Sequence, residues 1–134
     1  NMAFWLLKTE PSSYAYSDLV RERKTVWDGV SNNLALKYIR QIRKGDLALI
    51  YHTGAEKAVV GIATVISDPY PDPEQNNPRL VVVDIKPKRK LIREISLAEV
   101  KSNSKLKNFD LVRLPRLSVM PVEAKVWEEL VQEN

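Results

Sequence analysis

The sequence predicts an α+β domain in which a small curved sheet, mixed or antiparallel, carries helices at its ends. β-rich runs occupy most of the chain, and short segments with helical periodicity and cap signals lie between them. Their order follows neither a regular β–α alternation nor an all-helical pattern. Because 134 residues, 44% of them hydrophobic, are enough for one buried core, we expect a single domain over residues 2–134. Asn1 precedes Met2, and we expect it to be a cloning remnant.

The N-terminal region begins with an apolar run, "AFWLLKT", at residues 3–9. This run predicts a first strand that ends at Glu10 and Pro11, because the residue before a proline and the proline itself disfavour regular structure. Ser17 then offers a cap for a short helix over residues 17–23.

A second, better helix is predicted over residues 34–44, with Asn32 or Asn33 as its cap. One face of this helix is apolar and consists of Ala35, Tyr38, Ile39 and Ile42. Another face is basic and consists of Lys37, Arg40 and Lys44. The helix should therefore bury one stripe and present a positive one.

Two β-rich runs follow, at residues 46–52 and 57–67, and the loop between them contains Gly54. This arrangement predicts a hairpin. Residues 68–78 hold four prolines, which should prevent regular structure there.

A third β-rich run covers residues 79–95, and its interior proline, Pro87, should sit at a bulge or an edge. Ser96 and Glu99 form a capping box that starts a short helix. Residues 122–132 show the apolar periodicity of a last helix.

Composition excludes several kinds of site. The chain has no cysteine and one histidine, so disulfides, thiol nucleophiles and clustered metal ligands are not expected. The common catalytic and nucleotide-binding motifs are absent. We therefore expect no metal, no cofactor and no catalytic residues. The N-terminus lacks a signal peptide and no segment reads as a membrane span, so we expect a cytoplasmic protein, or a nuclear one in a eukaryote.

Trp27 stands directly before Asp28 and Gly29, a turn signal, rather than inside an apolar run. Either the indole fills the core beside a turn, which is the commoner case, or it faces a ligand. Trp5 and Trp127 are assigned to the core.

Two polar features have both a structural and a functional interpretation. Glu10, Ser12 and Ser13 follow the first strand, where they could cap a turn or contact a ligand. His52 ends a strand and could serve there as a structural residue or as a cleft residue.

Basic residues exceed acidic ones by four, which is compatible with a polyanionic partner. The densest basic stretch, "KPKRKLIR" at residues 86–93, is usually a solvated edge strand. It could also follow a phosphate backbone together with the basic helix face.

Five separated motifs occur in order: "WLLKTEPSSY", "VWDGVSNN", "GDLALIYHTG", "VGIATVISDPYPDP" and "RLSVMPV". Together they cover almost the whole chain, and on them the sequence resembles the EVE domain family. The resemblance implies a PUA-like fold, which is a small curved β-barrel with flanking helices related to the YTH and ASCH domains. It also implies a reader of modified bases, such as a modified cytosine or adenine, in DNA or RNA.

The resemblance implies an aromatic pocket built by these segments, with Trp27 as the plane on which the base stacks. Its implied ligand-binding residues are Thr9, Ser12, Ser13, Trp27, Asn32, Tyr51, His52, Arg116 and Ser118. The residues expected to contact phosphate are Lys37, Arg40, Lys44, Lys88 and Arg89. Many relatives read Arg-Asn-Tyr-Gln after the tryptophan motif, whereas this chain has Ser-Asn-Asn-Leu at residues 31–34, so a charged and an aromatic contact are missing.

Two other functions stay open on the sequence. A hydrolase or nuclease on an ASCH-like framework, acting on RNA or modified nucleosides, could use Lys8, Glu10, Tyr51 and His52. A protein-interaction module would make the basic charge incidental. Of the three functions we favour the binding of a modified base. We also expect that the protein is a monomer and not an enzyme.

Overall fold

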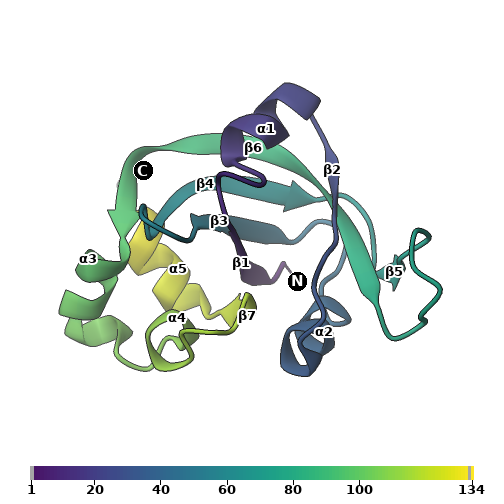
Figure 1. The fold of residues 1–134 in the computed structure, drawn as a ribbon. Coiled ribbons are helices and arrows are strands. Elements are labelled where there is room, and N and C mark those ends of the chain that lie inside the picture. The colour runs from purple at the N-terminus through teal and green to yellow at the C-terminus, as the bar shows by residue number, and fades with distance from the viewer. Residues whose placement is uncertain (1, 133) are drawn as a thin grey trace.

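One curled β-sheet forms the centre of the molecule (Figure 1). The computed structural model describes residues 2–132 and 134, so Asn1, the expected cloning remnant, lies outside the described residues. The strands are β1 Phe4–Thr9, β2 Thr25–Trp27, β3 Leu47–His52, β4 Ala58–Val65, β5 Tyr70–Pro71, β6 Val81–Ser96 and β7 Val119–Val122. The helices are α1 Tyr16–Glu22, α2 Asn33–Ile39, α3 Leu97–Ser102, α4 Asp110–Arg113 and α5 Ala124–Val131, with a 3₁₀ turn η1 at Ser104–Leu106.

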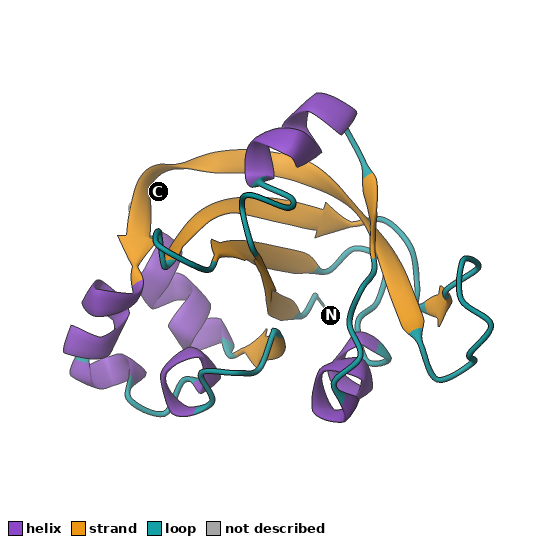
Figure 2. Cartoon of the chain, viewed as in Figure 1, coloured by secondary structure: helices purple, strands orange, loops and turns teal. Residues whose placement is uncertain are grey.

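The strand order is β2-β6-β4-β3-β1-β7, and β5 pairs with β6 outside this path. β1 and β3 run parallel and the other pairs are antiparallel, so the sheet is mixed. Helices α3, α4 and α5 group at one end of the curl, with α1 and α2 beside other parts of it (Figure 2). The predicted α+β class with a curved mixed sheet is confirmed. Within the described residues no pairing joins β2 to β7, so the sheet is a half-barrel.

Most predicted strands form where expected. The first apolar run becomes β1, and the predicted hairpin becomes β3 and β4, with Gly54 at φ 77° in its loop. The proline-rich loop was predicted to lack regular structure, but it contains one short strand, β5. β2 and β7 were also not predicted, because runs of three or four residues are too short to show a period.

Pro87 lies at a bulge of β6, as predicted. Ala63 pairs with Pro87 and Ile62 pairs with Arg89, which leaves Lys88 as an extra residue. The ring of Tyr16 packs beside this bulge, and its hydroxyl donates to the Ile62 carbonyl at 2.7 Å. Through Tyr16, α1 therefore packs against and stabilises the sheet at the bulge of β6.

The first two helices differ in detail from the prediction. Ser17 does not cap α1; Ala15 is the N-cap residue, and the carboxylate of Asp18 accepts from the Ala15 N–H at 2.8 Å. The side chain of Asn32 caps α2 as predicted, by accepting from the Ala35 N–H at 3.0 Å.

Helix α2 ends at Ile39 rather than at residue 44 because its last turns tighten into i→i+3 bonds, which leave the chain at Gly45 with φ 97°. The predicted basic helix face is therefore wrong in part. Lys37 lies in α2, Arg40 is the C-cap residue, and Lys44 lies in the following turn, where its N–H donates to Asp68. The capping box at Ser96 and the last helix, now α5, are confirmed.

A buried carboxylate joins the start of β1 to the turn after α2. Asp46 is 3% exposed. Its Oδ1 accepts from the Ala3 N–H at 3.0 Å, and its Oδ2 accepts from the Trp5 indole N–H and the Arg43 N–H, each at 2.9 Å. Its carboxylate thus accepts hydrogen bonds from three separate points of the chain.

None of the helices in the described part of the chain has the length and apolar composition needed to span a bilayer.

Replacing Asp46 with Asn should lower the free energy of unfolding by about 2 to 3 kcal/mol, because an amide group in place of one oxygen leaves a buried N–H donor facing another donor. The measurement is urea denaturation followed by circular dichroism. The matched control is Asp68→Asn, because the exposed Asp68 accepts one bond, from the Lys44 N–H, that an asparagine oxygen can also accept. Equal losses in the two variants would contradict a special role for Asp46.

Candidate functional site

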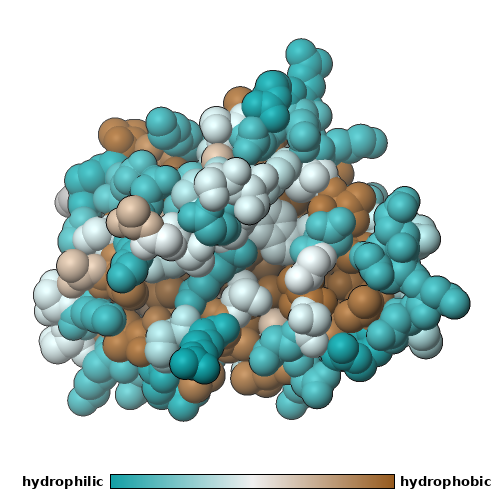
Figure 3. Space-filling model, in the orientation of Figure 1, coloured by the Kyte–Doolittle hydropathy of each residue, from teal (hydrophilic) through white to brown (hydrophobic). Residues whose placement is uncertain are grey.

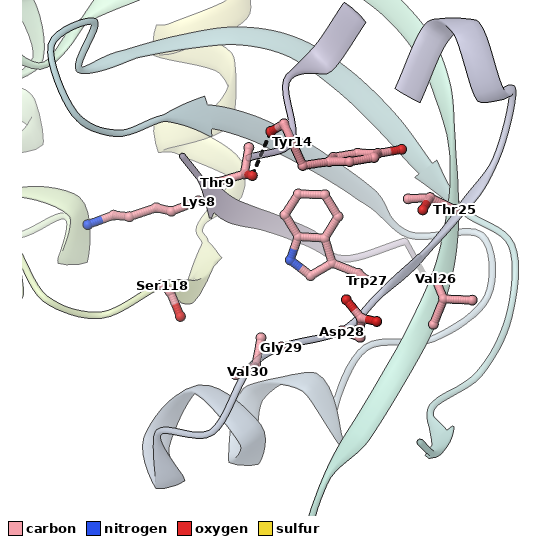
Figure 4. Close-up of a pocket in the computed structure, with 10 residues that line it drawn as sticks. All are labelled: Lys8, Thr9, Tyr14, Thr25, Val26, Trp27, Asp28, Gly29, Val30 and Ser118. Carbon is pink, nitrogen blue, oxygen red and sulfur yellow. Dashed lines mark hydrogen bonds between the residues drawn. The ribbon is translucent and has the colours of Figure 1, made fainter. Parts of the chain in front are cut away.

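A cavity of about 430 Å³ opens between β2, the end of β1 and the start of β7 (Figure 4). Cavities of this size hold small ligands. Its walls combine two aromatic rings, those of Tyr14 and Trp27, with hydroxyl, carboxylate and lysine side chains, and we call it the Trp27 cavity. The lining residues are Lys8, Thr9, Tyr14, Thr25, Val26, Trp27, Asp28, Gly29, Val30 and Ser118.

Trp27 belongs both to the core and to this cavity. It pairs with Val83 of β6 and is 7% exposed, whereas the preceding Val26 is 41% exposed on the other face of β2. The ring of Tyr14 meets the indole edge-on, with centroids 6.2 Å apart and an interplanar angle of 82°. Figure 4 shows the indole face-on and the Tyr14 ring above it, so Tyr14 does not cover the face of the indole.

The indole N–H of Trp27 reaches the cavity. No hydrogen bond engages it among the described residues, and none of their fully buried side-chain N or O atoms lacks a partner, so this N–H is not sealed from solvent. Figure 4 shows the nitrogen on the side of the ring nearer Ser118. Trp5 differs, because its N–H is bonded to Asp46 at 2.9 Å. Trp27 thus keeps a donor for a ligand.

Lys8 borders the cavity. Its Nζ donates to the Pro115 carbonyl at 2.9 Å and lies 5.5 Å from the centre of the Tyr51 ring. Burial lowers the pKa of the Lys8 ammonium, because the charged form loses hydration there.

Two further groups differ in how they are engaged. The hydroxyl of Tyr14 donates to Glu22 at 2.7 Å, and burial first, with the charge of Glu22 after it, raises the pKa of Tyr14 to about 12. Tyr14 therefore stays neutral at physiological pH.

The Asp28 carboxylate is exposed and makes no hydrogen bond within the described residues. It is an acceptor available to a ligand.

A second cavity, of about 330 Å³, lies between the start of α2 and the segment that joins α4 to β7. We call it the Arg116 cavity. Its lining residues are Asn32, Leu34, Arg113, Leu114, Pro115, Arg116 and Leu117.

The structure divides the sequence-predicted ligand residues among several places. Thr9, Trp27 and Ser118 line the Trp27 cavity, and Asn32 and Arg116 line the Arg116 cavity. Ser12 and Ser13 lie exposed in the loop after β1, where the hydroxyl of Ser12 bonds to Glu10. Tyr51 is buried at 3% exposure in β3. The binding role of these eight residues, and of His52, stays a prediction.

His52 lies elsewhere, in a separate cavity of about 350 Å³ beside α1. Its Nε2 accepts from the Tyr16 N–H at 3.0 Å, and its Nδ1 lies 3.2 Å from both carboxylate oxygens of Glu56. Both ring nitrogens are therefore engaged within the protein.

Hydrogen bonds from Ser12, above all from its side chain, lower the pKa of Glu10. The residues of the hydrolase hypothesis thus do not form one site: Lys8 lies 5.5 Å from the Tyr51 ring and lines the Trp27 cavity, whereas His52 lines the separate cavity beside α1.

The five residues predicted to contact phosphate are all exposed. Lys88 and Arg89 lie at the bulge of β6, and Arg40 donates to the Arg79 carbonyl at 2.8 Å. Within residues 2–132 and 134, no group of three His, Asp or Glu side chains is placed to hold a metal ion.

Tyr14 and Thr25 line the Trp27 cavity but were not predicted from the sequence. Thr25 could have been found if β2 had been recognised, because it lies two residues before Trp27 and alternate residues share a face. Tyr14 meets Trp27 only through the tertiary fold, and no local pattern indicates that contact.

The sequence model of the EVE domain matches residues 3–133. Human thymocyte nuclear protein 1 is 31% identical over an alignment that covers 92% of this chain and 70% of that protein.

Solved structures are similar over nearly the whole chain. A protein from Rhodopseudomonas palustris is 37% identical with a TM-score of 0.93, covering 98% of this chain and 92% of the other. Human THYN1 in complex with DNA that contains 5-methylcytosine is 27% identical with a TM-score of 0.89, covering 97% and 96%. An ASCH structure from Zymomonas mobilis, 12% identical with a TM-score of 0.63 over 99% and 96%, shares the fold. The predicted PUA-like fold is confirmed.

Trp27→Phe and Trp5→Phe should both lower the free energy of unfolding, and the loss should be about 1 to 2 kcal/mol smaller for Trp27→Phe. Both changes remove similar ring area, but only Trp5→Phe also takes a donor from the buried Asp46. Urea denaturation followed by circular dichroism measures both. A larger loss for Trp27→Phe would show that the Trp27 N–H has a structural partner.

Proposed function

This chain belongs to the EVE domain family, and on that premise we propose that it binds a modified nucleobase in nucleic acid within the Trp27 cavity. The observation that carries the proposal is the Trp27 indole, which lines a cavity of about 430 Å³ and whose N–H has no hydrogen-bond partner among the described residues. A base taken out of its stack needs an aromatic surface and polar groups at its edge. Stacking on an aromatic side chain contributes about 1 to 3 kcal/mol per base.

The polar groups of the cavity favour a base with an exocyclic amine. Asp28 offers a carboxylate that makes no hydrogen bond in the described part of the chain, and a carboxylate accepts from amines such as N4 of cytosine. The indole N–H of Trp27 offers a donor to an acceptor on the base. The human relative THYN1 has a structure in complex with DNA containing 5-methylcytosine. Its base satisfies both requirements, and we propose a modified cytosine as the preferred ligand.

Positive charge supplies the second part of the interaction. The chain has a net charge of +4, and exposed lysines and arginines contact phosphates without regard to sequence. Lys8 lines the Trp27 cavity and Arg116 lines the neighbouring one, and we propose these two cations as phosphate contacts.

We propose binding rather than catalysis. A general base must have a ring nitrogen or carboxylate available to the substrate. Both nitrogens of His52 are engaged by Tyr16 and Glu56, and the Glu10 carboxylate is bonded to Ser12. The geometry offers the hydrolase hypothesis no support.

The first test is a titration of the protein with short single-stranded DNA oligomers that contain one 5-methylcytosine or one cytosine, followed by tryptophan fluorescence at two salt concentrations. We expect saturable quenching that favours the modified oligomer. Trp27→Phe keeps an aromatic ring but removes the N–H, so it should weaken binding about tenfold, the loss of roughly one hydrogen bond and some stacking area. Its binding is followed by anisotropy of a labelled oligomer.

Trp127→Phe is the matched control, because Trp127 stacks on Phe4, its replacement keeps an aromatic ring, and it lines neither cavity. Its binding should equal that of the unchanged protein. Equal affinity for both oligomers that falls steeply with salt would mean that the protein binds phosphate only through non-specific charge, and it would overturn the proposal.

Asp28→Asn separates two roles of a carboxylate. If Asp28 accepts from the amine of the base, the variant should bind the 5-methylcytosine oligomer about fivefold more weakly, because a neutral acceptor makes a weaker bond. If Asp28 only repels phosphate, the variant should bind every oligomer more tightly. Anisotropy titration with both oligomers distinguishes these results, and tighter binding of all oligomers would contradict the amine contact.

A further inference from the structure

The Arg116 cavity has an apolar floor that reaches the surface. Leu34 lies in α2 but is 37% exposed, and Leu114, Pro115 and Leu117 face it across the cavity. Figure 3 shows hydrophobic residues reaching the lower edge of the molecule among mainly hydrophilic ones, where Figure 1 places α2 and the segment before β7. An apolar floor of this kind favours a flat, poorly hydrated group over a polar one.

A turn holds a cation at this floor. The Leu117 N–H donates to the Leu114 carbonyl at 3.0 Å, so residues 114–117 form a β-turn with Pro115 and Arg116 at its centre. Proline fixes φ at the second position of such a turn and makes the turn rigid. Arg116 is exposed and makes no ion pair or hydrogen bond within the described residues, whereas Arg113 is paired with Asp110 at 2.9 Å. The turn therefore presents an available guanidinium.

The two cavities share their dividing wall. Lys8 lines the Trp27 cavity, and its Nζ donates to the carbonyl of Pro115, which lines the Arg116 cavity. Ser118 lines the first cavity and directly follows Leu117, which lines the second. The two cavities are therefore adjacent, and a strand bound in one can continue over this wall into the other.

We infer that the Arg116 cavity binds the nucleotide next to the modified base on the same strand. The neighbouring base lies on the floor formed around Leu34, and the guanidinium of Arg116 binds the phosphate between the two nucleotides. A guanidinium matches a phosphate in both charge and geometry, and the base supplies the flat apolar group. This inference rests on the proposed function, because it places the neighbour of a base already held in the Trp27 cavity.

The test uses four single-stranded DNA oligomers of one length. The central base is 5-methylcytosine or cytosine, and its two neighbours are either nucleotides or abasic sites that keep the phosphates. Preference for the modified centre tests the Trp27 cavity, and dependence on the neighbouring bases tests the Arg116 cavity. With the unchanged protein, abasic neighbours should raise the Kd about tenfold, the effect of exposing one buried apolar group.

Two variants locate the effect. Leu34→Ser should abolish the dependence on neighbouring bases while preserving the preference for 5-methylcytosine. Arg116→Gln should weaken binding of all four oligomers and reduce the slope of log K against log salt by about one. Lys101→Gln, which removes a charge from the exposed face of α3, is the matched control and should change neither quantity.

Each other result overturns the inference. If neighbours have no effect but 5-methylcytosine is still preferred, the Arg116 cavity does not hold a nucleotide and the proposed function stands. If the neighbour effect survives in Leu34→Ser, the base binds elsewhere. If Lys101→Gln acts as strongly as Arg116→Gln, the guanidinium contributes only general charge. If neither the central modification nor the neighbours matter, the inference and the proposed function both fail.

Discussion

The buried carboxylate of Asp46 is the interaction on which the position of β1 depends. It accepts from Ala3 and Trp5 at the start of β1 and from Arg43 in the turn after α2. A charged acceptor with three donors is costly to rearrange, because each donor left without a partner loses a strong bond. β1 is thereby fixed lengthwise against β3, with Trp5 opposite Ala48. A strand held in this way cannot slip by one residue without exchanging its two faces.

That register decides what lines the Trp27 cavity. Lys8 and Thr9 form the far end of β1, and the Lys8 N–H donates to the Ser118 carbonyl at 2.9 Å, so three of the lining residues depend on one strand pairing. Trp27 is placed from the opposite end of the sheet, through the pairing of β2 with β6. The cavity exists because the curl of the sheet brings these two ends near each other (Figure 1). A flat sheet with the same strand order would separate them.

The sequence predicts those parts of the fold that have a local cause. The hairpin, the bulge at Pro87 and the caps at Asn32 and Ser96 follow from turn, proline and capping chemistry within a few residues. The early end of α2 does not, because Asp46, which accepts from the Arg43 N–H in the turn after the helix, is held in place by long-range bonds from Ala3 and Trp5. The same limit applies to the site. Trp27 stood out by its unusual neighbours, whereas the contact with Tyr14 and the separation of His52 from the Trp27 cavity arise only when the sheet curls.

The double role of Trp27 bears on how a small modification is recognised. A buried methyl group contributes about 0.8 kcal/mol, so a protein that distinguishes a methylated base gains little from it unless the walls of its cavity cannot close around the smaller, unmethylated base. Most walls of the Trp27 cavity belong to strands or lie next to them, and the indole itself is packed in the core at 7% exposure, with Tyr14 against it and Tyr14 bonded in turn to Glu22. Under the proposed function, an indole held by the core cannot move in to fill the space that a missing methyl group leaves. Because the core keeps the indole in place, a base without the methyl group would lose packing contacts in the cavity as well as buried apolar area.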